Sequence, residues 1–600
     1  MVSIVPTHLA VKAMRDNGYK NAAYALAELM DNSIQAGASH VELLCAEKIE
    51  QLPQRQRRRI YQVAVLDDAQ GMDRETLRIA LQFGNGTRLD PSNQDGIGRF
   101  GMGLPASSIS QCQRVDVWTW QDGVENALFT YLDLDEIADQ TMTDVPEPTH
   151  KPLPEIWRQV GKSWGKSGTL VVWSKLDRIV WRTAKALFDN SEFVIGRMYR
   201  RFLADGRVSI RFAAFDEGNT KSITIDTQAK PNDPGYLMVG TSTPAPWDKQ
   251  AMFAPFGEEI SIHHVKFNGQ EHEVKIQYSL AVEAARQGYN PGSRDYGQHA
   301  RRNMGLSIVR ADRELELDDG WCDPSAPTDR WWGIEVEFPP ALDEVFGVTN
   351  NKQHAHNFSE FANVKIEDLI GEGRSFEDLR SEMEDDEDPR APLLDIVNRI
   401  QKNRNVMRNL LKAQTATEDR RARKRHTETD SPESRATEAT RDRKGEGHQG
   451  RSDIDESLPN EEREKQLGKE LEAQGLPEAA AKEIAARTIL DGLKYVFAEA
   501  DLETPAFFSV KPKGGSIIIT LNTSHPAYSS LVEVLERDPA DEGLADLKAR
   551  LQSAEDGLKL LLMAWARYED ELPDGPQREK AQETRMHWGQ LARKFLRNDG

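Results

Sequence analysis

Long apolar runs, patterned cysteines and a charged-then-apolar leader are all missing from this 600-residue sequence. No apolar run approaches the roughly 20 residues that span a bilayer, and the opening MVSIVPTHLAVKAMRDNGYK is mixed and polar, unlike a signal segment. The three cysteines, Cys45, Cys112 and Cys322, lie far apart, so the sequence indicates neither a disulfide framework nor a zinc site. These absences predict a cytoplasmic protein that has no membrane segment.

Positive charge is also scarce. The formal net charge is −21 at pH 7, which argues against a protein that coats nucleic acid over its whole surface. Two local basic segments remain, QRQRRRI at 54–60 and RRARKRH at 420–426. Pattern alone favours a solvated loop or linker for each. Any DNA contact is therefore expected only through such local patches.

The 600 residues exceed what one core can hold, so roughly three or four domains are expected. Helical patterns alternate with short β-rich runs in the first part of the chain, and the strand-like runs are 61–72, 115–120, 168–176, 207–215, 222–225, 259–267, 272–281, 305–315 and 331–339. The later part is mainly helical and very polar. The expected domains are 1–190, 191–360, a helical segment 361–413, a disordered charged linker 414–465 and a mainly helical domain 466–600, which holds a hairpin at 507–522 with Gly514 and Gly515 at its turn.

Residues 26–38, LAELMDNSIQAGA, place four polar side chains in an otherwise apolar helix. Glu28, Asp31, Asn32 and Gln35 are either the wet face of that helix or a set aimed at a ligand. Glu28, Asn32 and Gln35 share one face because they are spaced by four and three residues. A carboxylate and an amide one turn apart can hold a water and a Mg²⁺ beside a phosphate chain.

Two further segments favour the second interpretation, in which the polar side chains are aimed at a ligand. DGIGRFGMGLPASSISQC at 95–112 is rich in glycine, so backbone N–H groups can close on an anion, and a helix start follows Leu104. By itself such a loop is equally typical of a flexible surface. VLDDAQGMD at 65–73 places Asp67 at the end of a strand, just before a turn that contains Gly71. A carboxylate there can accept a hydrogen bond from an exocyclic amine, which is the chemistry that selects adenine.

Together the segments resemble the Bergerat nucleotide-binding fold of the GHKL ATPase superfamily, which includes gyrase B, heat-shock chaperones, sensor histidine kinases and MutL proteins. The matching elements, in order, are ELMDNSIQAGA (28–38), LDDAQGM (66–72), GRFGMGLPASS (98–108) and SGTLVV (167–172). The resemblance covers about the first third of the chain. It implies an α+β protein with an N-terminal Bergerat-fold α/β sandwich, a β–α transducer domain and a mainly helical C-terminal region.

The resemblance also implies the roles of individual residues. Glu28 is similar to the general base that orients the attacking water, and Asn32 to the magnesium ligand. Asp67 would contact the adenine amine, with Thr169 supporting it, while the glycines of the loop would bind phosphates through their backbones. The nucleotide-binding residues implied are Asn32, Asp67, Gly71, Met72, Gly98, Gly101, Gly103, Leu104 and Thr169. One departure is Ala69, because the family usually has glycine at this place in D-x-G-x-G.

Other implied elements lie around this site. Residues 83–98 would form a mobile lid. VFGVTNNKQH at 345–354 resembles the N-K-Q element of MORC-type ATPases, and it makes Lys352 a catalytic sensor of the γ-phosphate; the alternative is an exposed loop lysine. GLSIVRADREL at 305–315 is similar to a strand-turn element of that family's transducer, which leaves Arg310 and Arg313 without an assigned role.

The function implied is an ATP-hydrolysing protein that uses Mg²⁺ and forms an ATP-dependent homodimer in a DNA transaction or defence system. Glu28 favours hydrolysis, since histidine kinases of this fold usually lack that base. The alternatives are a chaperone-like ATPase that remodels proteins and a histidine-kinase-like regulator. The C-terminal domain is expected to contact a protein partner. Its His525 is either catalytic or a structural loop histidine.

Overall fold

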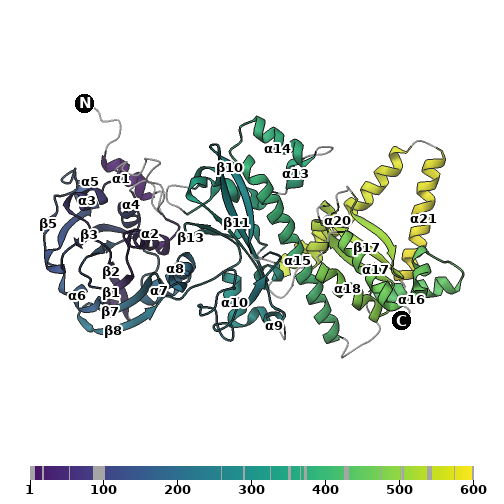
Figure 1. Cartoon of the computed structure of the whole chain (residues 1–600), viewed down its shortest axis with the longest axis horizontal. Helices are drawn as coiled ribbons and strands as arrows, with labels where there is room; N and C mark the ends of the chain where they lie inside the picture. Colours follow the sequence, from purple (N-terminus) through teal and green to yellow (C-terminus); the bar gives the residue numbers. More distant parts are fainter. Residues whose placement is uncertain are drawn as a thin grey trace. The chain divides into compact units, whose positions relative to one another are not determined.

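Figure 1 shows the computed structural model of the chain, which divides into two compact units. The first unit comprises Met1–Cys322, Gly333–Lys365 and Arg374–Leu394, and the second comprises Asp323–Trp332, Ile366–Gly373 and Asp395–Gly600. The structure describes residues 7–596 apart from 17–18, 53–54, 85–101, 259, 288–290, 324–325, 349–352, 365, 371–374, 424–431, 475, 477, 501, 503–505, 524, 537–543 and 573–574.

An eight-stranded sheet forms the N-terminal part of the first unit, with the strand order β5-β4-β3-β6-β2-β1-β7-β8. Neighbouring strands run antiparallel except for β1 and β7, which are parallel. The strands are β1 His40–Leu52, β2 Arg55–Asp67, β3 Cys112–Trp120, β4 Leu128–Asp133, β5 Thr149–His150, β6 Gly168–Leu176, β7 Ser209–Asp216 and β8 Asn219–Gln228.

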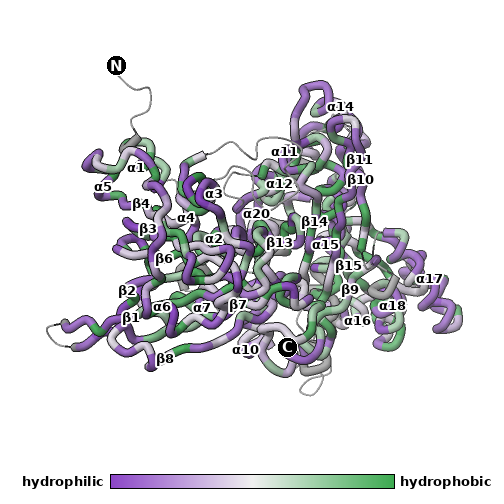
Figure 2. Tube along the Cα trace, turned by 60° about the vertical axis from the view of Figure 1, so that its left-hand side comes forward, coloured by the Kyte–Doolittle hydropathy of each residue, from purple (hydrophilic) through white to green (hydrophobic). Residues whose placement is uncertain are grey.

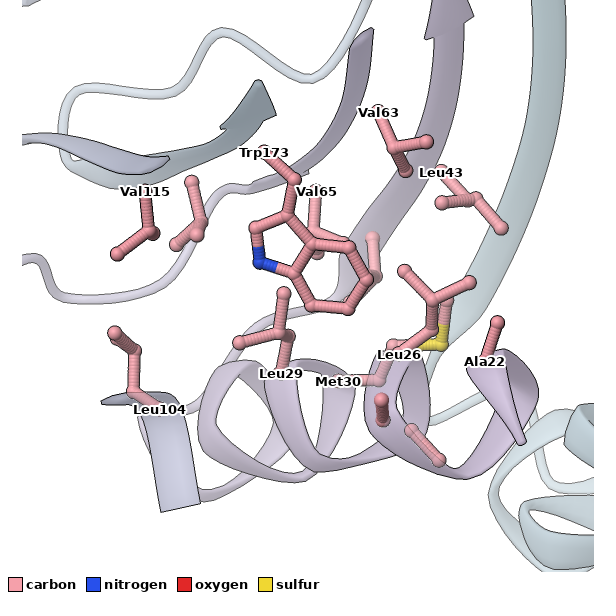
Figure 3. Packing of buried hydrophobic residues seen from close by; sticks show 14 of the residues in the cluster. Ala22, Leu26, Leu29, Met30, Leu43, Val63, Val65, Leu104, Val115 and Trp173 are labelled. Carbon is pink, nitrogen blue, oxygen red and sulfur yellow. The ribbon is translucent and has the colours of Figure 1, made fainter. Parts of the chain in front are cut away.

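Each face of this sheet has its own hydrophobic core, because successive strand residues point to opposite sides. Leu43 faces the core that contains Leu29 of α2 and Trp173 of β6, which Figure 3 shows from close by. Its neighbour Leu44 faces the opposite core, which Trp157 of α6 completes. The helices of this region are α1 Thr7–Asp16, α2 Ala22–Gln35, α3 Arg74–Ala80, α4 Gly103–Gln111, α5 Leu134–Ala138, α6 Glu155–Val160, α7 Ala184–Met198 and α8 Arg200–Ala204.

The hairpin of β1 and β2 extends beyond the rest of the sheet. The two strands pair as far as Leu52 and Arg55, whereas β7 pairs with β1 only to Glu47 and β6 pairs with β2 only from Val63. Figure 2 shows the hydrophilic colouring of this extension. Residues 55–60 of the basic segment QRQRRRI therefore lie in a strand rather than in the solvated loop that the charge pattern favoured. Pairing with β1 supplies the backbone hydrogen bonds, which a charge pattern does not reveal.

A second sheet of six strands lies in the same unit, with the order β10-β11-β14-β12-β13 and with β9 paired to β11. Strand β12 is antiparallel to β13 and parallel to β14. The elements are β9 Phe253–Pro255, β10 Ser261–Phe267, β11 Gln270–Ala281, β12 Leu306–Arg310, β13 Arg313–Asp318, β14 Trp332–Phe338, α9 Glu283–Arg286, α10 Asp295–Arg302, α11 Asp343–Phe346, α12 His356–Ser359 and α14 Phe376–Asp385. A strand lies in each of the expected runs, except that the single run 305–315 forms two antiparallel strands, β12 and β13, joined by a turn at Ala311 and Asp312. The mixed α/β fold class is confirmed.

The second unit is built around a three-stranded sheet with the order β15-β17-β16. Helices α17 and α18 supply the apolar residues that pack on it. The expected hairpin is confirmed, with Gly514 at φ 56° and Gly515 at φ 80° between β16 and β17. The elements are β15 Tyr495–Ala500, β16 Phe508–Lys513, β17 Ser516–Asn522, α13 Ile366–Ile370, α15 Leu394–Arg423, α16 Pro432–Gly445, α17 Asn460–Ala473, α18 Glu478–Leu490, α19 Val534–Glu536, α20 Leu544–Glu571 and α21 Pro576–Leu596. None of the helices in the described ranges has an apolar stretch long enough to cross a membrane.

Two stretches of the second unit differ from expectation. The pattern over 478–500 predicts one amphipathic helix, but α18 ends at Leu490 and β15 begins at Tyr495. Gly492 lies between them at φ 62°, a backbone conformation typical of the residue that ends a helix. The aromatic and β-branched residues that follow favour a strand.

The charged stretch 414–465 contains ordered elements where a disordered linker was expected. Helix α16 packs against β15, where the backbone N–H of Lys494 donates a 3.0 Å hydrogen bond to Thr437 Oγ1. The buried ammonium of Lys494 pairs with Asp453 at 2.5 Å. Polar groups that satisfy one another hold this segment in place, and a hydrophobic pattern cannot predict that kind of packing.

Candidate functional site

The polar residues of LAELMDNSIQAGA lie on α2 and are largely buried. The side chain of Asn21 caps the helix by accepting hydrogen bonds from two backbone N–H groups of the first turn. Glu28 is only 4% exposed and Asp31 is fully buried, while Asn32 and Gln35 are half-buried. The four side chains are therefore not the wet face of a surface helix.

The carboxylate of Glu28 lies against the first residue of α4. A Cβ added to Gly103 would stand 2.0 Å from Glu28 Oε1, so glycine is required for so close an approach. Among the described residues, no side chain caps the start of α4 at Met102. The first N–H groups of such a helix bind an anion readily. A carboxylate at a helix N-terminus lies where it can act on a ligand bound by the first N–H groups of that helix.

Asp67 ends β2, where three hydrogen bonds fix its buried carboxylate. Ser33 Oγ donates to Oδ2 at 2.7 Å, and the backbone N–H groups of Ala69 and Thr169 each donate to Oδ1 at 3.1 Å. Burial raises the pKa of Asp67 from 3.8 to about 6, although these three bonds act in the opposite direction. The group is thus an oriented acceptor that is mainly ionised at neutral pH.

Sheet register aligns Asp67 with two threonines on the neighbouring strands. Asp67 pairs with Thr169 of β6, and Thr169 pairs with Thr119 of β3. Thr119 Oγ1 lies 3.1 Å from Thr169 Oγ1 and accepts a hydrogen bond from the Met72 backbone N–H at 2.9 Å. Thr119 and Ser33 are not predicted from the sequence motifs, because only the register of β3 on β6 and the face of α2 place them beside Asp67 and Thr169.

The turn after Asp67 explains one glycine and one departure from the family pattern. Gly71 has φ 68°, and a Cβ there would stand 2.1 Å from the carbonyl oxygen of Trp120. Ala69 is buried, yet it is not among the described non-glycine residues with positive φ. Alanine therefore fits its backbone at this place, so the departure leaves the turn intact.

Asn32 is the residue that suits a Mg²⁺ ion. It lies one turn after Glu28 on α2 and is half-buried. Leu104 of α4, another residue of the predicted site, is 9% exposed. Magnesium beside a nucleotide keeps several waters and takes few ligands from the protein. The described residues contain no cluster of three or more His, Cys, Asp or Glu side chains that could hold a metal ion. The side-chain oxygen of Asn32 is a ligand of the kind that this chemistry uses.

Part of the predicted site lies outside the described residues. This holds for Gly98 and Gly101 of the phosphate loop, for Lys352, and for the expected lid 83–98 beyond Gly84. Gly103, by contrast, is brought next to Glu28 as described above.

The residues that follow Lys352 are anchored at the start of the α2 region. Gln353 Oε1 accepts a 3.2 Å hydrogen bond from the backbone N–H of Lys20. His354 Nδ1 and Lys20 Nζ both contact Glu316 Oε1 of β13, at 2.7 and 3.1 Å. The chain therefore returns to the residues just before α2 one residue after Lys352.

Residues 19–164 match the family model of the histidine kinase-, DNA gyrase B- and HSP90-like ATPases. These residues are therefore similar to a GHKL-type ATPase domain, and they are called the GHKL domain below. The matched range contains the positions of Glu28, Asn32 and Asp67, and it ends before Thr169.

No curated protein matches the chain. One solved structure with similarity is described as the crystal structure of the N-terminal domain of a DNA repair protein. It is 14% identical, the similarity covers 59% of this chain and 95% of that chain, and the TM-score is 0.35.

Proposed function

We propose that this protein binds ATP with Mg²⁺ in its GHKL domain and hydrolyses it to ADP and phosphate. The position of Glu28 against Gly103, at the start of α4, carries the proposal. A carboxylate held at the phosphate end of the site can take the proton of an attacking water. Asn32 holds the Mg²⁺, and the ion supplies charge stabilisation for the phosphates.

Asp67 provides the selection of adenine. Both of its oxygens are already oriented by Ser33, Ala69 and Thr169, so the carboxylate does not have to reorganise when the base arrives. Its remaining acceptor capacity suits the exocyclic amine of adenine. Guanine presents an oxygen at the corresponding position, so two acceptors would face each other with no proton between them.

Lys352 is proposed to contact the γ-phosphate and so to report which nucleotide is bound. The support is the anchoring of the next residue, Gln353, to the backbone of Lys20 just before α2. A lysine at this place stabilises negative charge that develops on the γ-phosphate. ADP lacks that phosphate, so only ATP recruits the lysine.

ATP binding is further proposed to close two copies of the chain into a dimer that acts in a DNA transaction. The DNA would contact the extended β1–β2 hairpin through Arg55–Arg59, since the overall charge of −21 repels DNA elsewhere. Two of these arginines already have acidic partners, Arg58 with Asp216 at 3.7 Å and Arg59 with Glu50 at 3.0 Å. The contact is therefore weak and falls steeply with salt.

Steady-state phosphate release by the purified chain, with and without duplex DNA and over a series of salt concentrations, tests this function. We expect turnover above that of the Glu28→Ala variant and stimulation by DNA that disappears as salt rises. Turnover equal to that of Glu28→Ala would contradict ATP hydrolysis at this site. Turnover that responds to an unfolded client protein but not to DNA would replace the DNA role by the chaperone-like alternative.

A further inference from the structure

The β12–β13 hairpin of the second sheet reaches the helix that carries the base. Arg313, the first residue of β13, donates from Nε to Asp31 Oδ1 at 2.8 Å, and Tyr199 OH donates to the same oxygen at 2.7 Å. All three side chains are buried, with the side chain of Arg313 2% exposed and that of Asp31 0%. Asp31 lies on α2 between Glu28 and Asn32.

Two arginines, Arg201 and Arg207, hold the turn of this hairpin. Ala311 and Asp312 have φ of 51° and 64°, which non-glycine residues rarely adopt and which persist where the surroundings impose them. The Asp312 carboxylate accepts hydrogen bonds from Arg201 and Arg207, at 3.0 Å each. The position of Arg313 is therefore fixed by its neighbours in the chain.

A buried ionic network holds the next residue of β13 to α7 and α8. Glu314 pairs with Arg197 at 2.5 Å and with Arg200 at 2.8 Å. Burial alone would raise the pKa of Glu314, but the two guanidinium groups outweigh it and hold the pKa below its usual value. Strand β13 is thus attached to α7, to α8 and to Arg207 by charged groups on both sides of Arg313.

The other strand of the hairpin leads toward Lys352. Arg310 of β12 makes a bidentate pair with Asp343 of α11, at 2.6 and 2.9 Å. Helix α11 ends at Phe346, six residues before Lys352 in the sequence. One hairpin therefore connects the element that precedes the proposed sensor to the helix that carries the proposed base.

We propose that Arg313 is a positioning residue for Glu28 and Asn32, which it acts on through Asp31. The proposal rests on the proposed function. A helix moves as a unit, so a rotation or shift of α2 displaces Glu28 and Asn32 together with Asp31. Arg313 prevents such a shift because Asp31, without its partner, would be a buried and uncompensated charge. A displacement of about 1 Å in a catalytic group is enough to lower a rate about 10²-fold.

If the Arg313–Asp31 pair had a purely structural role, a different result would be expected. A double variant distinguishes this structural role from the positioning role. Asp31→Asn/Arg313→Met removes both charges, keeps a side-chain oxygen as acceptor for Tyr199, and leaves no unpaired ion. Replacing both partners of a buried ion pair often preserves stability, whereas removing one does not. If the pair only holds the fold together, the double variant should recover both the stability and the turnover that either single variant loses.

The matched control is a second buried ion pair of the same domain, Arg211 with Glu42 at 2.5 Å. It lies on the face of the sheet turned away from α2, because Glu42 points to the same side as Leu44. The control variant Glu42→Gln/Arg211→Met also removes two charges and keeps an acceptor. We expect it to hydrolyse ATP at the wild-type rate.

The experiment measures the melting temperature, the ATP dissociation constant and kcat for the wild type, both double variants and Glu28→Ala. We expect Asp31→Asn/Arg313→Met to melt near the wild type and to bind ATP with unchanged affinity while kcat falls about 10²-fold. Amide hydrogen exchange of α2 in the nucleotide-free protein should also become faster in this variant and not in the control.

Wild-type kcat in Asp31→Asn/Arg313→Met would overturn the positioning role and leave the proposed function standing. A wild-type rate no higher than that of Glu28→Ala would instead overturn the proposed function, and the positioning role with it. If the double variant does not fold, Arg313→Lys replaces it, since lysine keeps the charge but not the planar donor geometry. Its kcat should then fall at unchanged ATP affinity, and an unchanged kcat would overturn the proposal.

Discussion

Arg313 and Asp31 are 282 residues apart in the sequence, and the guanidinium Nε of one donates a 2.8 Å hydrogen bond to the carboxylate of the other. The pair joins the second sheet of the first unit to the helix that carries Glu28. A second link, between Lys20 and Glu316 at 3.1 Å, lies at the start of the same helical region. In the first unit, the region of the eight-stranded sheet and the second sheet therefore meet at α2, the helix that carries the proposed base.

Replacing Asp67 by asparagine should weaken ATP binding. The carboxylate would lose the charge that strengthens its hydrogen bond to adenine, an effect of roughly 1.5–3 kcal/mol, or about 10- to 100-fold in affinity. Isothermal titration calorimetry measures the change. The neighbouring Asp68→Asn is the control, since Asp68 accepts hydrogen bonds from Ser39 and His40 instead. Equal affinities for both variants and the wild type would contradict the adenine role.

Asp67 should also make the stability of the nucleotide-free protein depend on pH. Its pKa is about 6 in the folded protein, raised by burial from 3.8. The folded state therefore binds this proton more tightly than the unfolded chain does. The resulting destabilisation is absent below pH 3.8, grows as pH rises, and is complete above about 6, where it amounts to about 3 kcal/mol.

Asp67→Asn lacks this titration, so its free energy of unfolding should gain about 2.4 kcal/mol relative to the wild type between pH 4 and pH 7. Urea unfolding of both proteins across this range measures the difference. A difference that stays constant with pH would show that Asp67 titrates alike in the folded and unfolded chains.

Several parts of the site could be predicted from the sequence because a short motif fixes them. Glu28 and Asn32 are four residues apart on one helix, and Asp67 is followed closely by a glycine that its turn requires. Thr119 could not be predicted in this way, since its place beside Thr169 depends on how β3 pairs with β6. Register is decided by the packing of the whole sheet.

Strand β1 shows a second reason why local patterns fail. Its Glu42 and Glu47 are 1% and 4% exposed, although charged residues usually indicate a solvent-facing position. Glu42 accepts hydrogen bonds from the backbone of Lys162 and Ser163, and Glu47 accepts one from Ala184. These partners are more than 100 residues away, so no local window contains the information.

Lys352→Ala should hydrolyse ATP about 10²-fold more slowly and bind ADP normally, because the lysine would act only on a γ-phosphate. Phosphate release and ADP calorimetry test the two halves of this prediction. Lys185→Ala serves as the control, since Lys185 is exposed and pairs with Asp189 on the same helix. If Lys352→Ala turns over at the wild-type rate, the sensor role belongs to another residue.

ATP, and not ADP, should convert the Glu28→Ala protein from monomer to dimer. Such gating requires ATP to favour the closed form by about 5 kcal/mol. The segment before Tyr19, which includes α1, is expected to contribute to the two-fold contact. Analytical ultracentrifugation with ATP, with ADP and without nucleotide measures the mass. The same mass in all three conditions would rule out a nucleotide-gated dimer.

The central claim is that Glu28 is the general base of an ATPase, and single-turnover phosphate release tests it most directly. The measurement compares the wild type, Glu28→Ala and the control Glu42→Gln/Arg211→Met, each with ATP binding confirmed beforehand by calorimetry. We predict that Glu28→Ala binds ATP normally and releases phosphate about 10²- to 10⁴-fold more slowly, while Glu42→Gln/Arg211→Met keeps the wild-type rate. A Glu28→Ala rate within a few-fold of the wild type would contradict the claim.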